Sequence, residues 1–335
     1  MEIVMRPYEQ KFIEWAKDKP KVLVLSADLT NSCDIGAWAK TYPDRFFSMG
    51  LSEQNMMGVA AGLARRGFFP YIHTFAVFIY RRPYDQLAMS IAYPNLPVRL
   101  IGFLPGITTP GGVSHQAIDD IAILRATPNM TILDCGDATD VESVLDVAQA
   151  VNGPVYVRML RGEVPRLFDR SEPMQFNRAR VLSWGTDITV LSEGICTEEA
   201  MRASGALKSG GLSVSHLHVT TLKPFSDPQI LEAIHASRYG VITMENHTIN
   251  GGLGSAVAEL MAENGIGKKL TRIGLQDTYA HGASRPYLMK EYHLDAMSLV
   301  QAIERLIGEE LHIVEKDLAA VQIQPVHSAA KAEAL

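Results

Sequence analysis

The sequence predicts an α/β fold of two domains, each with a mostly parallel sheet flanked by helices. Short segments rich in β-branched residues alternate with amphipathic segments, which is typical of a sheet covered on both faces. This pattern lapses once, after Arg161, and resumes at Asp187. The chain has 335 residues, enough for two separate cores. Two α/β domains joined by a linker are therefore expected.

Residues 1–165 are expected to form the first domain. Its strand candidates are rich in β-branched and aromatic residues, and they lie within 21–28, 45–50, 68–75, 97–103, 130–135 and 153–159. The segments between them have helical periodicity at 53–65, 82–92, 116–126 and 138–151. This order of elements predicts a parallel sheet in which helices connect the strands.

The second domain is expected at residues 186–312, after a linker at 166–185 that carries two prolines and many charges. Its strand candidates lie within 187–194, 212–219, 239–246 and 270–275, and its helix candidates lie near 197–209, 227–236, 252–264 and 296–308. The last part of the chain, residues 313–335, is rich in alanine and is expected to be a flexible tail.

Composition excludes several functional classes. The formal net charge is -6 and no run of basic residues occurs, so neither a nucleic acid nor a membrane surface is expected as a partner. No apolar run approaches the roughly 20 residues that span a bilayer, and the first residues lack the apolar core of a signal peptide. The three cysteines are far apart, which favours a reducing compartment over a disulfide framework or a metal cluster. We expect a cytoplasmic enzyme or enzyme subunit.

Polar and aromatic residues follow the ends of several predicted strands of the first domain. Ligands of open parallel sheets bind beyond the carboxyl ends of the strands, so these residues are candidates for one site. The candidates that follow successive strands are Ser32, Glu53, Phe75 with Phe78, His115, and Arg161.

Glu53 has an ordinary interpretation and a functional one. Ser52 is a good N-cap, and a carboxylate in the first turn stabilises a helix by about 0.3–1 kcal/mol, which is the commoner reason for a Glu at that place. However, the helix continues with Gly58, Ala60 and Gly62, which are poor choices for a solvated helix. Small residues let another backbone approach closely, so we expect a packed interface and a partly desolvated Glu53.

His115 ends a long loop that contains Gly111 and Gly112. A single histidine on a loop is more often a surface residue, but long loops inside compact domains are often functional. Arg161 follows a strand and Arg6 lies near the start of the chain. Both could pair with acidic neighbours or bind an anion, since the guanidinium group fits phosphate or sulfonate.

Two further patterns carry less weight. The segment NGGLGSAV at 250–257 follows a strand and opens a helix, but it lacks the full spacing of a dinucleotide fingerprint. His216 and His218 share one face of a strand without a third ligand nearby, so no metal site is expected there.

Taken together, the motifs resemble a known family. SADLTNS, RFFSMGLSEQNMMGVAAGLA, YIHTFAVFIYRRPYDQL, GGVSHQAIDDIAILRATPNM and GPVYVRMLRG occur in this order, followed by TTLKPFSD and TMENHTINGGLGSAVAE. They resemble the pyrimidine-binding domain and the C-terminal domain of the transketolase group of thiamine-diphosphate enzymes. In that group a diphosphate-binding domain with a magnesium motif comes first. The resemblance therefore implies the small, C-terminal subunit of a split transketolase.

The resemblance also implies roles for individual residues. Glu53 matches the glutamate that hydrogen-bonds the aminopyrimidine ring of thiamine diphosphate. Phe78 matches the aromatic residue that stacks on this ring, and Phe75 and Arg81 are assigned to the cofactor with it. His115 matches a histidine that contacts substrate hydroxyls. Three positions match those that bind the phosphate of sugar phosphates, and they are Arg6, Ser32 and Arg161.

Two positions depart from the family pattern. Gly111 stands where the family has an aspartate that meets a donor hydroxyl, and Phe103 stands in the substrate region where a histidine is common. The cofactor-related residues match while the sugar-related ones differ. We therefore expect a ketose donor other than xylulose 5-phosphate, for which apulose 4-phosphate and sulfofructose are examples.

The implied activity is transfer of a two-carbon ketol unit from a ketose to an aldose phosphate. It requires thiamine diphosphate and Mg²⁺ shared with a diphosphate-binding subunit in an α2β2 assembly, with the magnesium site on the partner. The alternatives are a 1-deoxyxylulose-5-phosphate synthase-like subunit, the beta subunit of a 2-oxoacid dehydrogenase, or a non-catalytic partner subunit. A nucleotide-binding oxidoreductase built on residues 250–257 is the weakest alternative.

Overall fold

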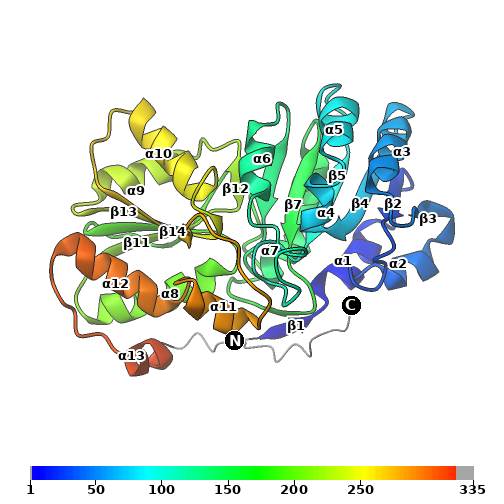
Figure 1. The fold of residues 1–335 in the computed structure, drawn as a ribbon. Helices are drawn as coiled ribbons and strands as arrows, with labels where there is room; N and C mark the ends of the chain where they lie inside the picture. Colours follow the sequence, from blue (N-terminus) through cyan, green and yellow to red (C-terminus); the bar gives the residue numbers. More distant parts are fainter. Residues whose placement is uncertain (1, 322–335) are drawn as a thin grey trace.

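The computed structural model describes residues 2–321 and contains two α/β units that lie side by side (Figure 1). The first has a seven-stranded sheet in the order β12-β6-β7-β5-β4-β2-β3, and the second has a five-stranded sheet in the order β14-β13-β10-β11-β9. Within each sheet all pairings are parallel except the one made by a single edge strand, β12 or β9. The predicted fold class is confirmed.

The first sheet is apolar because helices cover it. Four of its central strands are buried along their whole length, as expected for parallel strands covered on both faces. Its strands are β2 (Val22–Ser26), β3 (Phe46–Ser48), β4 (Phe69–Phe75), β5 (Arg99–Phe103), β6 (Thr131–Asp134), β7 (Val155–Met159) and β12 (Thr221–Lys223). The accompanying helices are α1 (Pro7–Trp15), α2 (Gly36–Thr41), η1 (Pro43–Arg45), α3 (Glu53–Arg65), α4 (Ala76–Tyr80), α5 (Tyr84–Gln86), the π-helix η2 (Leu87–Ala92), α6 (Asp120–Ala126) and α7 (Ala138–Ala150). A separate two-stranded ribbon joins β1 (Ile3–Met5) to β8 (Glu163–Pro165).

The second sheet contains β9 (Arg180–Ser183), β10 (Ile188–Ser192), β11 (Val214–His218), β13 (Gly240–Thr248) and β14 (Leu270–Leu275). Its helices are α8 (Cys196–Ser209), α9 (Pro228–Ala236), α10 (Leu253–Glu263), α11 (Arg285–Glu291), α12 (Ala296–Ile307) and α13 (Glu315–Ala320). Between residues 2 and 321, no helix combines the length and the apolar character needed to cross a bilayer.

Several predicted elements are corrected by the structure. The helix expected at 82–92 is divided into α5 and η2 and begins only after Pro83, which lacks the N–H that a continuing helix would need. The helix expected at 116–126 begins at Asp120. The segment expected as a linker, 166–185, contributes β9 to the second sheet. In the expected tail, residues 315–320 form α13, and 322–335 lie outside the described residues.

Strand β12 connects the two units. It belongs by sequence to the second half, yet it pairs antiparallel with β6 at the edge of the first sheet. Figure 1 shows it between the two sheets. The second half of the chain therefore supplies an edge strand to the first sheet, which carries the candidate site.

A cluster of buried charges also joins the halves. The Arg158 side chain on β7 has no exposed surface, and its guanidinium group contacts Asp120 at 2.9 Å, Asp134 at 3.0 Å and Glu193 at 3.1 Å. It also donates to the backbone carbonyl of Asn246 at 2.9 Å. Burial and the charge of Glu193 raise the pKa of Asp134 well above its ordinary value, so this cluster holds fewer negative charges than carboxyl groups. Arg158 is thus an interior counter-ion and is not available to bind an external anion.

Candidate functional site

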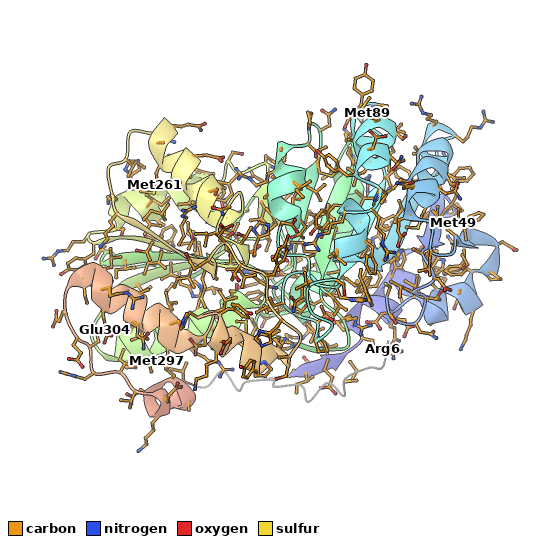
Figure 2. The ribbon with its side chains drawn as sticks, in the orientation of Figure 1. Arg6, Met49, Met89, Met261, Met297 and Glu304 are labelled. Carbon is orange, nitrogen blue, oxygen red and sulfur yellow. The ribbon has the colours of Figure 1, made fainter. Side chains whose placement is uncertain are left out.

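Glu53 is the first residue of α3, and its side chain is only 4% exposed. The predicted capping of α3 by Ser52 is wrong, because the Ser52 hydroxyl donates to the carbonyl of Met49 at 2.6 Å and makes no bond to the helix. Figure 2 labels Met49 just after β3, in the turn that leads to α3. The turn therefore places the Glu53 carboxylate at the carboxyl edge of the first sheet.

The partner of Glu53 is Arg82, a residue that sequence reasoning did not select. Nη1 of Arg82 lies 2.5 Å from Oε1 of Glu53. The guanidinium group also lies over the ring of Phe78, with its central carbon 3.8 Å from the ring centroid. Phe78 and Phe75 stack with their centroids 5.9 Å apart. Glu53, Arg82 and the two phenylalanines therefore form one contact chain.

His115 joins this chain from the opposite side. Its ring meets the rings of Phe78 and Phe75 edge-on, with centroids 5.5 Å and 6.1 Å away. Nδ1 of His115 lies 2.9 Å from the Ser114 hydroxyl. A Cβ added at Gly111 would lie 3.0 Å from Cβ and Cγ of His115, so the glycine makes room for this ring. The structure thus brings His115 together with the predicted cofactor residues.

The three predicted phosphate ligands also converge. The Arg161 guanidinium group donates to the carbonyl of Ser32 and lies over the Phe75 ring, 5.7 Å from its centroid. The backbone N–H of Arg6 donates to the carbonyl of Gly162 at 2.7 Å, beside Arg161. Figure 2 shows Arg6 at the start of α1. Arg6 and Arg161 therefore border the same region from two distant parts of the sequence.

A buried acid lies between these arginines. Asp34 is 4% exposed, and Arg6 Nε is 3.6 Å from its Oδ1. Burial raises the pKa of the Asp34 carboxyl, while a backbone N–H and the two nearby guanidinium groups oppose that rise. Both Arg6, with a φ of 46°, and Asp34, with a φ of 48°, have left-handed backbones, which are strained for residues with a side chain. Strain of this kind is common at binding sites.

Two predicted residues lie elsewhere. Phe103 has no exposed surface and packs in the core, with its centroid 5.5 Å from Tyr8 and 6.3 Å from His73. Arg81 points away from Glu53, because its guanidinium group contacts Asp119 at 2.7 Å and the carbonyl of Val113 at 3.3 Å. Phe103 is nevertheless the cross-strand neighbour of Phe75, with which it is paired in the register of β4 and β5.

The second half of the chain also reaches the site. Gln116, beside His115, donates to the carbonyl of His281 at 3.2 Å. A Cβ added at Gly112, which has a φ of +71°, would lie 3.2 Å from the backbone nitrogen of Gly282. The backbones of the two loops are therefore in close contact, and the second domain supports the loop that carries His115. No local signal in the sequence links these segments.

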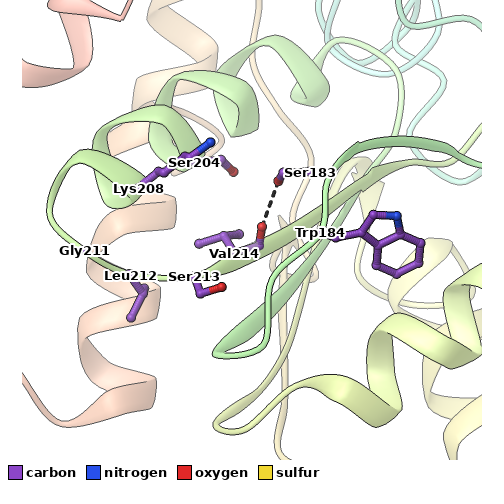
Figure 3. Close-up of a pocket in the computed structure, with 8 residues that line it drawn as sticks. All are labelled: Ser183, Trp184, Ser204, Lys208, Gly211, Leu212, Ser213 and Val214. Atoms are coloured by element: carbon purple, nitrogen blue, oxygen red, sulfur yellow. Dashed lines mark hydrogen bonds between the residues drawn. The ribbon is translucent and has the colours of Figure 1, made fainter.

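A metal-binding cluster or a hollow that could hold a ligand would also mark a site in the structure. Among the described residues, no group of three or more His, Cys, Asp or Glu side chains could hold a metal ion. Figure 3 shows a hollow between β9, β11 and α8, in which the Ser183 hydroxyl donates to the carbonyl of Val214 at 2.8 Å and Trp184 points away from the other side chains. The residues that line it are Ser183, Trp184, Ser204, Lys208, Gly211, Leu212, Ser213 and Val214. None of the candidate site residues is among them.

Comparison with known proteins agrees with the two-domain fold. Residues 4–166 match the transketolase pyrimidine-binding domain, and residues 177–299 match the transketolase C-terminal domain. A Methanocaldococcus jannaschii protein, provisionally named a transketolase C-terminal section, is 38% identical over 90% of this chain and 96% of its own length. A 6-deoxy-6-sulfo-D-fructose transketolase subunit of Clostridium sp. (strain MSTE9) is 35% identical over 88% of this chain and 91% of its own length.

A solved structure is similar throughout. It is described as a split gene transketolase in the form of an inactive beta4 tetramer, and it has a TM-score of 0.81 at 35% identity. The match covers 90% of this chain and 97% of that one. The chain therefore belongs to the transketolase family, of which it contains the pyrimidine-binding domain followed by the C-terminal domain.

Proposed function

We propose that this chain is the small subunit of a two-subunit transketolase that transfers a two-carbon ketol unit from a ketose to an aldose phosphate. The observation that carries the proposal is the contact chain from Glu53 through Arg82, Phe78 and Phe75 to Arg161, with the ring of His115 against both phenylalanines. It combines a buried carboxylate, an aromatic surface, an imidazole and a cationic end. These are the groups needed to hold a heteroaromatic ring beside a phosphorylated sugar.

The residues fit the pyrimidine ring of thiamine diphosphate. The guanidinium group of Arg82, a flat group with N–H donors in its plane, already bonds Glu53 and lies on Phe78, so this place accepts a planar nitrogen-containing group. Glu53 would hydrogen-bond the ring and Phe78 would stack on it, with Phe75 behind. When bound, thiamine diphosphate supplies a nucleophilic carbon that takes up the two-carbon unit. The diphosphate and Mg²⁺ would be held by the partner subunit.

The remaining residues would orient the sugar. His115 lies at the edge of the aromatic pair and would contact a substrate hydroxyl there, since its ring can accept or donate a hydrogen bond. Arg161 and Arg6 would bind the phosphate, since guanidinium groups suit its oxygens.

The partner would contact α3. Gly58 and Gly62 are exposed, and a Cβ added at either would meet nothing within 4 Å. Leu51, just before this helix, is 73% exposed, and Met89 on η2 is 58% exposed. Figure 2 shows Met89 at the outer end of this half of the molecule. An exposed face with small residues and apolar neighbours supports close packing of a second subunit, in an α2β2 assembly.

The donor is proposed to be a ketose other than xylulose 5-phosphate. The absence of a side chain at Gly111 removes one hydrogen-bonding group from the loop that holds His115, and the structure shows that the His115 ring occupies the adjacent space. A relative named for 6-deoxy-6-sulfo-D-fructose supports a donor with an anionic group other than phosphate. Apulose 4-phosphate is a second donor to test.

The test is a coupled assay with the purified chain, thiamine diphosphate and Mg²⁺, with and without the diphosphate-binding subunit. Two-carbon transfer is expected only from the mixture, and the donor with the highest kcat/KM identifies the substrate. Activity of this chain alone would refute the two-subunit proposal. Preference for xylulose 5-phosphate would refute the proposed donor class, and condensation of pyruvate with glyceraldehyde 3-phosphate would instead favour a synthase of the 1-deoxyxylulose-5-phosphate type.

A further inference from the structure

Arg82 makes contacts that a bound pyrimidine ring would need for itself. Its guanidinium group donates to Oε1 of Glu53 at 2.5 Å and lies over Phe78, 3.8 Å from the ring centroid. The proposed function assigns the same two residues, Glu53 and Phe78, to the pyrimidine ring of thiamine diphosphate. A guanidinium group and an aminopyrimidine are both flat and both carry N–H donors in the plane, so one can replace the other at this pair.

The arginine is held loosely while its partner is held firmly. The Arg82 side chain is 45% exposed, whereas the Glu53 side chain is 4% exposed. The backbone around Arg82 is fixed independently, since Gln54 of α3 donates to the Arg82 carbonyl at 3.3 Å. The side chain can therefore leave the site without movement of α3 or of the turn that carries it.

A buried carboxylate needs such a partner when no ligand is bound. Without a hydrogen-bond donor, Glu53 would be an unpaired buried charge and would lower the stability of the fold. The neighbouring Arg81 cannot fill this role, because it pairs with Asp119 at 2.7 Å. Arg82 is the arginine whose side chain satisfies both Glu53 and the face of Phe78.

We propose that Arg82 is a built-in placeholder that occupies the pyrimidine position of the free chain and is displaced when the cofactor binds. This inference rests on the proposed function, since it takes Glu53 and Phe78 as the ring's binding residues. Displacement means that the cofactor competes with the arginine. The wild-type chain should therefore bind thiamine diphosphate more weakly than a variant that lacks the Arg82 side chain. The difference in affinity corresponds to the free energy of one partly exposed ion pair and one cation–π contact, which is roughly tenfold.

The test measures the Kd of thiamine diphosphate by isothermal titration calorimetry on the assembled two-subunit protein in the presence of Mg²⁺. Arg82→Ala is expected to lower the Kd about tenfold relative to wild type. Arg238→Ala is the matched control, because Arg238 also lies over an aromatic ring, that of Tyr239 at 4.8 Å, but in the second half of the chain. The control should bind the cofactor like the wild type.

An unchanged or higher Kd in Arg82→Ala would overturn the inference, and a higher value would show that the arginine holds the cofactor in place. Should Arg82→Ala fail to fold, Arg82→Lys replaces it, because lysine keeps the charge but cannot lie flat on Phe78. Its Kd should also fall below that of the wild type, and an equal or higher value again overturns the inference. Cofactor binding without two-carbon transfer would refute only the proposed reaction. Absence of cofactor binding to the wild-type assembly would refute both.

Discussion

Glu53 is a buried carboxylate at the head of a helix, paired with Arg82. Its carboxylate is held at the head of α3 by a turn in which Ser52 bonds the preceding backbone and not the helix. The helix N-terminus adds a favourable field for negative charge. A carboxylate that is 4% exposed and pairs with an arginine lying over Phe78 cannot be explained as a solvated helix cap.

We expect Glu53→Gln to lower the kcat of the assembled enzyme by at least about 100-fold, because an amide cannot exchange a proton with the ring as a carboxyl group can. The far-UV spectrum and the Tm of the free chain should change little, since glutamine keeps the size of the side chain and can still accept a hydrogen bond from Arg82. Glu263→Gln, at an exposed position of α10, is the control. A Glu53→Gln enzyme with more than half of the wild-type kcat would disprove the role of Glu53.

Gly111 is expected to determine how the donor sugar is recognised. In Gly111→Asp, the new Cβ would lie 3.0 Å from two atoms of His115, so the imidazole has to shift while a new carboxylate enters the sugar region. The KM for the native donor should rise about tenfold, and the Kd for thiamine diphosphate should stay the same. Gly267→Asp, where an added Cβ meets nothing within 4 Å, is the control. An unchanged KM would show that this loop does not contact the donor.

At the scale of elements, α3 has a buried face and an open face. Met56, Met57, Ala60 and Ala64 pack into the core, whereas Gly58 and Gly62 face open space. Glycine is costly inside a helix by roughly 0.5–1 kcal/mol relative to alanine. The free chain therefore gains no helix stability from these glycines, which is consistent with the proposed packing of a second subunit on this face.

Substitutions of Gly62 should affect the stability of the free chain and its association with the second subunit differently. Gly62→Ala should raise the stability of the free chain by about 0.5–1 kcal/mol in urea unfolding. Gly62→Leu should keep that fold but raise the Kd for the diphosphate-binding subunit at least about tenfold, because the larger side chain keeps the partner's backbone away. Analytical ultracentrifugation measures this Kd, with Gln301→Leu on an exposed position of α12 as the control. Equal association of Gly62→Leu and wild type would place the interface elsewhere.

The elements of the fold were largely predictable, and the reasons are physical. Every strand expected from a β-branched or aromatic segment lies at or close to its predicted place, as does each long helix, because burial on both faces leaves an apolar pattern. Short elements whose stability depends on distant partners were missed. Strand β12 exists because β6 offers it an edge, and α5 begins only after Pro83, inside a segment of otherwise helical pattern.

The site was predictable to a similar degree. Glu53, Phe75, Phe78 and His115 follow strand ends, and strand ends of a parallel sheet meet at one edge. Asp34 and Arg82 were missed because their importance comes from what they touch and not from their sequence neighbours. Phe103 was selected because it lies at a strand end, but its side chain packs against Tyr8 in the core.

At the scale of the whole molecule, the two halves are joined by charges that have no access to water. Arg158→Met should lower the free energy of unfolding by about 3–5 kcal/mol, because it leaves buried carboxylates of both halves without their counter-ion. Urea unfolding followed by fluorescence measures this loss. Arg170→Met removes an arginine that is 62% exposed and pairs with Glu2, and it should cost at most about 1 kcal/mol. Equal losses in the two variants would contradict this account.

The buried charges between the two halves also predict that the unfolding free energy depends on pH. Burial and the charge of Glu193 raise the pKa of Glu245 to about 8, although the N–H groups of Leu253 and Gly254 oppose the rise. A carboxyl group whose pKa is higher in the folded protein than in the unfolded chain favours folding below its unfolded pKa, and this contribution is lost as the pH rises toward 8.

Glu245→Gln removes this titration. The difference in unfolding free energy, wild type minus variant, should therefore fall between pH 5 and pH 8, by at most about 1.4 kcal/mol per pH unit. Urea unfolding at several pH values in this range measures it. Glu263→Gln, at an exposed position of α10, is the control. A constant difference for Glu245→Gln would show that this carboxyl group is ionised throughout the range.

Strand β12, which the second half supplies to the first sheet, has a consequence for how the protein folds during synthesis. During synthesis, β6 leaves the ribosome about 90 residues before β12, so the first sheet has an open edge until much of the second half has been translated. An open edge is a template for pairing with another chain. A fragment that ends near residue 165 should therefore aggregate during expression, and any division of this chain for study has to retain Thr221–Lys223 with the first half.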